Sequence, residues 1–220
     1  MKYLSDQEAK ELLIHVGRCL YESGLNRGVD GNLSCLTEDG TTLWTTGSGS
    51  AKGFLTSDDL VKTDLNGTVL QGGTKPSSEL KIHLCIYRHN DLAGAVVHTH
   101  SAAATALACA GVGLTKPIFP AVLMQLGKVF VTPYATPGTQ AVADGMLPYV
   151  EENNGVLLGN HGPVTWGKDL WQAMTRMETL EQSAKIYLQM QSIGSVQYLN
   201  REQEQELHEL GVKLGHFKKV

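Results

Sequence analysis

The sequence predicts an α/β protein in which helices pack on a mixed sheet. Short runs rich in β-branched and aromatic residues alternate with amphipathic helical segments along most of the chain. The chain has 220 residues, and 42% of them are hydrophobic, which suffices for one core in a single domain over 1–220. No internal repeat or low-complexity linker divides this domain.

The first half of the chain begins with a helix and continues with short strands. The helix starts at the capping box Ser5-Asp6-Gln7-Glu8 and ends before Gly24. Glu-Asp-Gly and Asn-Gly turns then separate short apolar runs, as in a meander. The expected strands are Asn32–Leu36, Thr42–Thr45, Val61–Thr63 and Thr68–Leu70. The serine pair at 77–78 caps a second helix that runs to about Asn90.

The second half alternates strands and helices more regularly. Ser101 is expected to cap a helix over 102–110, and Asp169 to cap a long helix that reaches Leu188. Segment 116–133 is interpreted as strand and loop, and a turn at 134–138 precedes a helix near 139–150. The expected strands are Gly94–His98, Val156–Leu158 and Pro163–Trp166. Residues 191–220 are polar and are expected to form a short helix or a tail.

Composition and charge exclude several classes of protein. The 18 Lys+Arg against 22 Asp+Glu give a net charge of −4, which argues against a nucleic-acid partner. No apolar run approaches the roughly 18–20 residues that cross a bilayer, so no membrane partner is expected. The N-terminus shows no signal-peptide pattern, and the four cysteines form no CxxC pair, which indicates reduced thiols in the cytoplasm.

Three histidines carry the strongest indication of chemistry. His98 and His100 are two residues apart on an expected strand, so their side chains point to one face, roughly 7 Å apart at the backbone. His161 follows a buried strand between Gly159 and Gly162, which let the backbone bend and present the ring. Three neutral imidazoles with an open fourth position describe a catalytic zinc site. The alternative is a strand end with one buried and one solvated histidine.

A carboxylate and two polar loops complete the candidate site. Glu79 is expected in the first turn of its helix, where the backbone amides and the hydroxyls of Ser77 and Ser78 could receive a phosphate. Simple helix capping is the alternative for these residues. The loop 46–50 is dense in amides and hydroxyls and could cradle an oxyanion, although it matches no phosphate-binding motif.

The order of these motifs resembles the class II aldolase/adducin family over about residues 5–190. The motifs are Gly31-Asn32-x-Ser34, Ser48-Gly49, Lys75-Pro76-Ser77-Ser78-Glu79 with His83, Val97-His98-Thr99-His100, Pro133-Tyr134-Ala135, Gly138-Thr139 and His161-Gly162. The resemblance implies an α/β/α fold with a central, largely antiparallel sheet flanked by helices. It also implies a homotetramer with the site near a subunit boundary.

The resemblance further implies roles for individual residues. One Zn²⁺ per subunit would be held by His98, His100 and His161, with Glu79 as a fourth ligand that swings away to act as acid and base. The substrate phosphate would lie against Gly31, Asn32, Ser48, Gly49, Ser77 and Ser78. The implied reaction cleaves a ketose 1-phosphate similar to L-fuculose 1-phosphate into dihydroxyacetone phosphate and a short aldehyde, through an enediolate that the metal stabilises.

The sequence departs from the aldolases of this family at the aldehyde end of the site. Those enzymes use a tyrosine in the region of 116–133, where this chain has none and Pro120 to Val122 stand instead. A tyrosine of their C-terminal tail is also missing, and Leu210 is the nearest counterpart. The sequence therefore does not identify the aldehyde half of the substrate.

Other activities of the family remain as alternatives. They are epimerisation of L-ribulose 5-phosphate, decarboxylation of a 3-oxo-tetronate 4-phosphate and dehydration of methylthioribulose 1-phosphate. The epimerases carry Asp where this chain has Glu79, together with an extra acidic residue that 111–132 lacks. A non-catalytic, adducin-like binding module is a more remote alternative, because all three histidines and Glu79 are present here.

Overall fold

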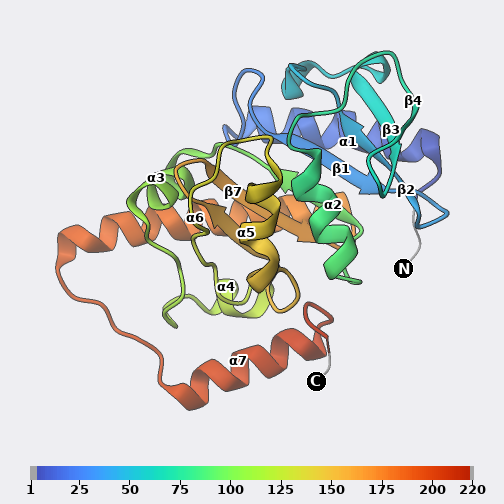
Figure 1. The fold of residues 1–220 in the computed structure, drawn as a ribbon. Coiled ribbons are helices and arrows are strands. Elements are labelled where there is room, and N and C mark those ends of the chain that lie inside the picture. Colours follow the sequence, from blue (N-terminus) through green and yellow to red (C-terminus); the bar gives the residue numbers. More distant parts are fainter. Residues whose placement is uncertain (1–3, 219–220) are drawn as a thin grey trace.

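The computed structural model describes residues 4–218 and contains an antiparallel seven-stranded sheet in the order β4-β3-β2-β1-β5-β7-β6 (Figure 1). The strands are β1 (Asn32–Leu36), β2 (Thr42–Thr46), β3 (Leu60–Asp64), β4 (Val69–Gln71), β5 (Ala95–His98), β6 (Gly155–Leu158) and β7 (Gly162–Gly167). Every pair of neighbouring strands in this sheet is antiparallel. The expectation of a mixed sheet is wrong, because alternating strands and helices do not by themselves fix strand direction. The α/β class and the largely antiparallel sheet are confirmed.

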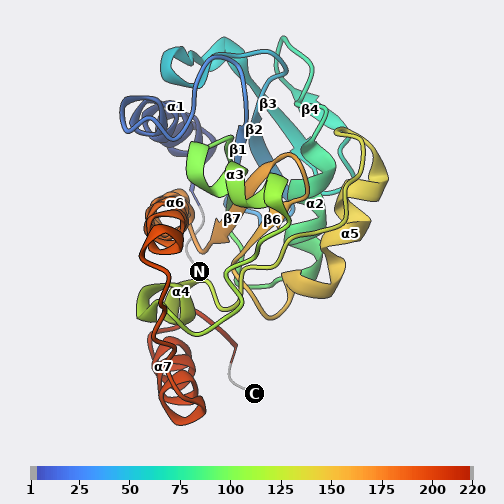
Figure 2. The same cartoon turned by 90° about the vertical axis from the view of Figure 1, so that its left-hand side faces the viewer.

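Helices cover both faces of the sheet, as Figure 2 shows edge-on. α1 (Asp6–Glu22) and α6 (Leu170–Ile193) pack on one face, and α2 (Leu80–His89) and α5 (Gln140–Val150) pack on the other. In β5, Ala95 and Val97 face α1 and α6, while Val96 faces α2 and α5. Because side chains alternate along a strand, His98 lies on the α2 face.

The capping signals in the sequence fix the starts of the two helices on the first face. The Ser5 hydroxyl accepts from Glu8 N, and the Glu8 side chain accepts from the Ser5 amide, so the expected capping box is formed. Asp169 accepts from Gln172 N at the start of α6. α3 (Ala102–Ala110) begins after Ser101 as expected, although that serine makes no side-chain cap hydrogen bond.

Two segments, 116–133 and 191–220, contain helices whose positions the sequence did not predict. Residues 116–133 contain the helix α4 (Pro120–Gln125), which begins at a proline in its first turn and was missed because the helix has only 6 residues and no side-chain cap. The polar end contains α7 (Arg201–Lys213), capped by an Asn200–Gln203 capping box, which confirms a short helix, one of the two expectations for residues 191–220. α7 packs against α4, away from the sheet (Figures 1 and 2). Within residues 4–218, no helix has both the length and the apolar character needed to span a bilayer.

Candidate metal centre

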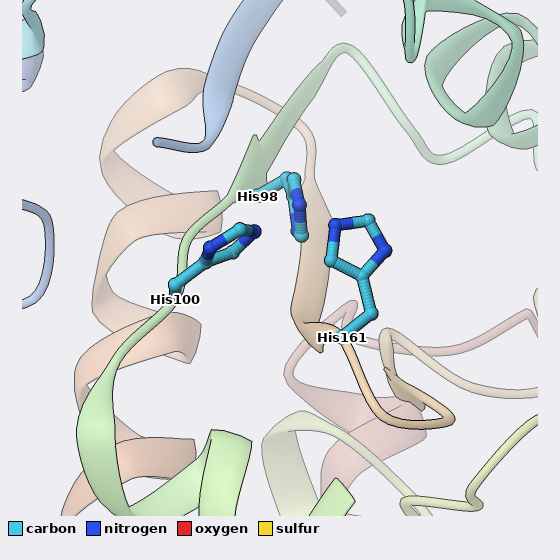
Figure 3. A group of neighbouring side chains, drawn as sticks. All are labelled: His98, His100 and His161. Carbon is cyan, nitrogen blue, oxygen red and sulfur yellow. The ribbon is translucent and has the colours of Figure 1, made fainter. Parts of the chain in front are cut away.

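The three histidines that the sequence singles out meet at one end of the sheet (Figure 3). Their ring centroids are 5.1 Å apart for His98 and His100, 4.8 Å for His98 and His161, and 5.0 Å for His100 and His161. One ring nitrogen from each histidine lies within 4.8 Å of the other two. This arrangement corresponds to three imidazoles around one position, as the spacing of the motifs predicts.

Hydrogen bonding fixes the orientation and the tautomer of His98. Its Nδ1 lies 2.9 Å from the carbonyl oxygen of Pro163. Because a carbonyl can only accept, Nδ1 carries the proton and Nε2 keeps a free lone pair. Burial lowers the pKa of His98 to about 4, although the Glu79 charge opposes this shift. His98 is therefore neutral at pH 7, which is the form that binds metals.

His100 and His161 come from less regular backbone than His98. Burial is the largest cause that lowers the pKa of His100, and the nearby His161 contributes as well. His161 lies in the turn between β6 and β7, where Asn160 adopts a left-handed φ of 56°. The residue with the unusual backbone is thus Asn160 and not either flanking glycine. The glycines serve close packing, since a Cβ on Gly162 would lie 2.6 Å from the carbonyl oxygen of Thr99.

Glu79 brings a carboxylate to the histidines. Its Oε1 lies 3.0 Å from His161 Nε2, and its Oε2 lies 3.5 Å from His98 Nε2. Burial raises the pKa of Glu79, but a hydrogen bond from His161, the charges of both histidines and a hydrogen bond from Asn32 outweigh burial and lower the pKa to about 2. The carboxylate is therefore ionised. Glu79 is the residue before the first turn of α2, so the expected position inside the first turn is wrong. Its side chain makes no cap hydrogen bond, whereas the Ser77 hydroxyl accepts from the Glu79 amide at 3.3 Å.

A chain of buried polar groups holds Glu79 from behind. Asn32 Nδ2 donates to Glu79 Oε2 at 2.9 Å, and Asn32 Oδ1 accepts a short hydrogen bond from His83 Nε2. The other His83 nitrogen lies 2.6 Å from the Ser34 hydroxyl, which lies 2.6 Å from the Tyr87 hydroxyl. Because burial lowers the pKa of His83 to about 3, the ring is neutral, donates from Nε2 and accepts at Nδ1.

The positions of Asn32 and Ser34 in this hydrogen-bonded chain follow from the alternation of side chains along β1 and from the register of β1 with β5. Asn32 and Ser34 lie on the α2 face of β1, because Leu33 and Cys35 between and after them belong to the opposite core. Asn32 also pairs with His98 across the β1–β5 ladder, which places it next to the histidines. His83 comes four residues after Glu79 in the sequence and supports the carboxylate through Asn32.

Gly31 allows β1 to start directly beside β5. Its φ of 68° is left-handed, and a Cβ at this position would collide with the carbonyl oxygen of His98. A side chain here would therefore push apart the two strands that carry Asn32 and His98.

A pocket of about 310 Å³ opens over the carboxylate and two of the histidines. It is lined by all six residues that the sequence analysis assigned to the phosphate, namely Gly31, Asn32, Ser48, Gly49, Ser77 and Ser78. Glu79, His100 and His161 form another part of its wall. The pocket also contains Asp30 and Lys52, which the sequence analysis did not identify, because nothing near either residue in the sequence marks it as part of a site.

The donor set fits a divalent cation. His98 Nε2 and His100 Nε2 are buried and make no hydrogen bond among the described residues. Buried polar atoms are normally paired, so two unpaired ring nitrogens on neighbouring histidines favour an external partner. Imidazole nitrogens with a carboxylate suit Zn²⁺, and an open coordination position is typical of catalytic zinc. The residues therefore fit a metal centre.

Comparison with known proteins finds similar enzymes. The chain is similar to the 3-oxo-tetronate 4-phosphate decarboxylase of Pectobacterium atrosepticum, with 40% identity over 187 residues, 83% of this chain and 84% of that protein. It is also similar to the L-fuculose phosphate aldolase of Methanococcus maripaludis, with 37% identity over 79% of this chain and 92% of the relative.

The fold has a close match among solved structures. An L-fuculose 1-phosphate aldolase superposes with a TM-score of 0.88 and 32% sequence identity, over 94% of this chain and 97% of that chain. The family described as "Class II Aldolase and Adducin N-terminal domain" matches residues 11–188. This chain therefore belongs to the class II aldolase/adducin family, and the two relatives named above are a decarboxylase and an aldolase.

Proposed function

We propose that this protein breaks the bond between the carbons α and β to the carbonyl group of a sugar phosphate or sugar-acid phosphate and releases dihydroxyacetone phosphate. One observation carries the proposal: three histidines and an ionised carboxylate meet at a pocket whose remaining wall is rich in amides and hydroxyls. The first group suits a divalent cation, and the second suits a phosphate.

The residues around the pocket divide the chemistry between them. A Zn²⁺ ion held by His98, His100 and His161 would supply a Lewis acid that stabilises negative charge developing on substrate oxygens. Glu79 would deliver a proton to the carbon that loses its bond, and in the reverse direction it would remove that proton. With its present histidine contacts the carboxylate is ionised, so Glu79 must lose those contacts before it can act as an acid.

The phosphate would be bound by the polar half of the pocket. Backbone amides at Gly31 and Gly49 and the hydroxyls of Ser48, Ser77 and Ser78 can donate to phosphate oxygens, and Asn32 lies between this half and Glu79. Asn32 already donates to Ser77 Oγ at 3.1 Å and to Glu79. It therefore links the phosphate end of the pocket to the carboxylate that moves the proton.

A 3-oxo-tetronate 4-phosphate is the first substrate to test. When its C1–C2 bond breaks, carbon dioxide leaves without its electron pair, and a proton added at C2 yields dihydroxyacetone phosphate. The departing carbon dioxide needs no proton transfer of its own, which agrees with the missing tyrosines at the aldehyde end. The similarity to decarboxylases at 40% identity also supports this substrate.

Cleavage of a ketose 1-phosphate such as L-fuculose 1-phosphate is the second candidate. The superposition on an L-fuculose 1-phosphate aldolase at a TM-score of 0.88 supports it. This reaction yields the same three-carbon product, and it differs in that the hydroxyl on the leaving carbon must give up a proton. The two candidates thus share the metal, Glu79 and the phosphate wall and differ only in the leaving group.

The resemblance supports two further proposals about the protein as a whole. We propose that it acts in the cytoplasm, in agreement with its free cysteines, and that it forms a homotetramer. Sedimentation at several protein concentrations measures the second point, and a monomer at all concentrations would refute it.

The deciding experiment compares substrates on one preparation of zinc-loaded protein. Dihydroxyacetone phosphate release is followed for a 3-oxo-tetronate 4-phosphate, L-fuculose 1-phosphate, L-ribulose 5-phosphate and methylthioribulose 1-phosphate. Carbon dioxide, aldehyde, epimer and dehydration product are measured in parallel. We expect dihydroxyacetone phosphate with carbon dioxide from the first compound. Dihydroxyacetone phosphate from none of them would refute the proposal.

A further inference from the structure

The pocket contains a buried lysine for which the mechanism above has no use. Among the described residues that line the pocket, Lys52 is the only lysine or arginine. Its side chain is almost completely buried, with 2% exposure. Buried lysines are uncommon and are normally paired with an anion. Lys52 therefore needs a physical explanation.

The Lys52 ammonium joins two loops of the pocket. Its Nζ donates to the carbonyl oxygen of Ser50 at 2.7 Å and to that of Val29 at 2.7 Å. Ser50 directly follows Ser48 and Gly49, and Val29 lines the pocket two residues before Gly31, so both carbonyls adjoin residues of the proposed phosphate wall. An ammonium has three N–H donors, so a third remains after these two bonds.

The charge of Lys52 is not neutralised by a direct contact. Within residues 4–218, no carboxylate forms an ion pair with Lys52. Burial lowers its pKa to about 8, while the more distant charges of Asp30, Glu79 and Asp59 oppose that shift. The group is still mainly protonated at pH 7. An anion bound in the pocket would offset the burial cost and accept the third hydrogen.

We propose that Lys52 binds the phosphate of the substrate and is the side chain that makes the site selective for phosphorylated compounds. The inference rests on the proposed function, since it assigns one residue within the same pocket. The amides and hydroxyls of the wall give the phosphate its position, and Lys52 supplies the positive charge that they lack. An unphosphorylated analogue leaves this charge unpaired and binds more weakly.

A purely structural role for Lys52, as a strut between the two loops, makes a different prediction. A strut stabilises the pocket equally for charged and neutral ligands. A phosphate-binding ammonium affects only the ligands that carry the phosphate.

The test measures binding of inorganic phosphate to the full-length protein by calorimetry, with no turnover required. Lys52→Met removes the charge and keeps the length of the aliphatic stem. Lys81→Met is the matched control, because the exposed Lys81 also donates to a backbone carbonyl, that of Gly138, but does not line the pocket. We expect the phosphate Kd to rise about 10- to 100-fold in Lys52→Met and to stay within about 2-fold of wild type in Lys81→Met.

Two more variants separate the effect of the Lys52 charge from the effect of its hydrogen bonds to the two loops. Circular dichroism shows whether each variant folds. Lys52→Gln keeps N–H donors without charge, and Lys52→Arg keeps the charge. If Lys52→Met does not fold, phosphate binding retained in Lys52→Arg and lost in Lys52→Gln supports the proposal. Unchanged binding in Lys52→Met or Lys52→Gln overturns it, as does a wild-type protein that binds no phosphate.

The outcome is distinguishable from a failure of the proposed function. If none of the sugar phosphates is turned over but Lys52→Met still loses phosphate, the proposed reaction fails and the assignment of Lys52 stands. If dihydroxyacetone phosphate is released and Lys52→Met binds phosphate like wild type, the assignment alone fails. On an active protein, the ratio of kcat/KM for a phosphorylated substrate and its unphosphorylated analogue should fall about 10-fold or more in Lys52→Met.

Discussion

Replacing His83 tests whether the buried polar chain positions Glu79. His83→Leu removes both ring nitrogens and keeps an apolar side chain of moderate size in a fully buried place. It leaves Asn32 Oδ1 without its hydrogen bond from His83 and takes the Nδ1 acceptor from the Ser34 hydroxyl. Each buried polar group left unpaired costs about 1–3 kcal/mol, so for these two groups we expect a loss of roughly 2–6 kcal/mol in the free energy of unfolding.

The same change should affect catalysis through the Asn32 amide. Without His83, nothing in this chain forces Asn32 to present its NH₂ group to Glu79, and the flipped amide would place an oxygen against the carboxylate. We therefore expect kcat to fall by about 10-fold, with KM and metal content close to wild type, because His83 is not one of the three converging histidines. Urea unfolding, steady-state kinetics and metal analysis measure the three quantities.

Ser34→Ala is the matched control for this prediction. It removes a hydrogen bond on the far side of the His83 ring and leaves the bond between His83 and Asn32 in place. We expect a stability loss of about 1–3 kcal/mol with kcat within about 2-fold of wild type. If His83→Leu loses stability but keeps wild-type kcat, the chain is structural only and the positioning argument is wrong.

Two further predictions concern ionised groups in the centre. Glu79→Gln should lower turnover by about 10²- to 10⁴-fold while the metal stays bound, because a general acid and base is lost; wild-type turnover would place the proton transfer elsewhere. Metal-free protein should lose stability on acidification from pH 7. In the folded protein the pKa values of His98 and His83 are about 4 and about 3, below their ordinary 6.5. Between the folded and the ordinary pKa values the unfolded chain therefore binds more protons than the folded protein, and lowering the pH favours unfolding. The pKa of Glu79, about 2 against an ordinary 4.5, adds to the loss below about pH 4.5. Urea midpoints at pH 7, 5.5 and 4.5 should fall in that order, and a midpoint that is unchanged or higher at pH 4.5 would contradict the assigned pKa shifts.

Sequence reasoning worked best where the decisive interactions are local. The capping box at Ser5 and Glu8 marks the start of α1, and alternation along β5 places His98 on the α2 face, with His100 two residues beyond the end of the strand. Order and spacing of the motifs were enough to identify the family. These features depend on residues that are close together in the chain or on patterns that many sequences share.

The parts of the site that could not be predicted from the sequence depend on tertiary contacts. Asn32 and His83 are 51 residues apart, and no local pattern predicts that a strand residue and a helix residue form one hydrogen-bonded chain behind Glu79. Local rules favoured capping for Glu79, because its contacts with the histidines arise only when β5 and the β6–β7 turn come together. Lys52 is similar: its place in the pocket depends on carbonyls from two separate loops.

The central claim is that His98, His100 and His161 bind one divalent cation, and metal content tests it most directly. Purified wild-type protein is compared by elemental analysis with the three single His→Ala variants and with His15→Ala, which changes a histidine outside the centre. We expect about one Zn²⁺ per chain in the wild type and in His15→Ala, and well under half of that in each of the other three variants. A wild-type protein that binds no stoichiometric divalent metal even after incubation with Zn²⁺, or three variants that retain it fully, would contradict the claim.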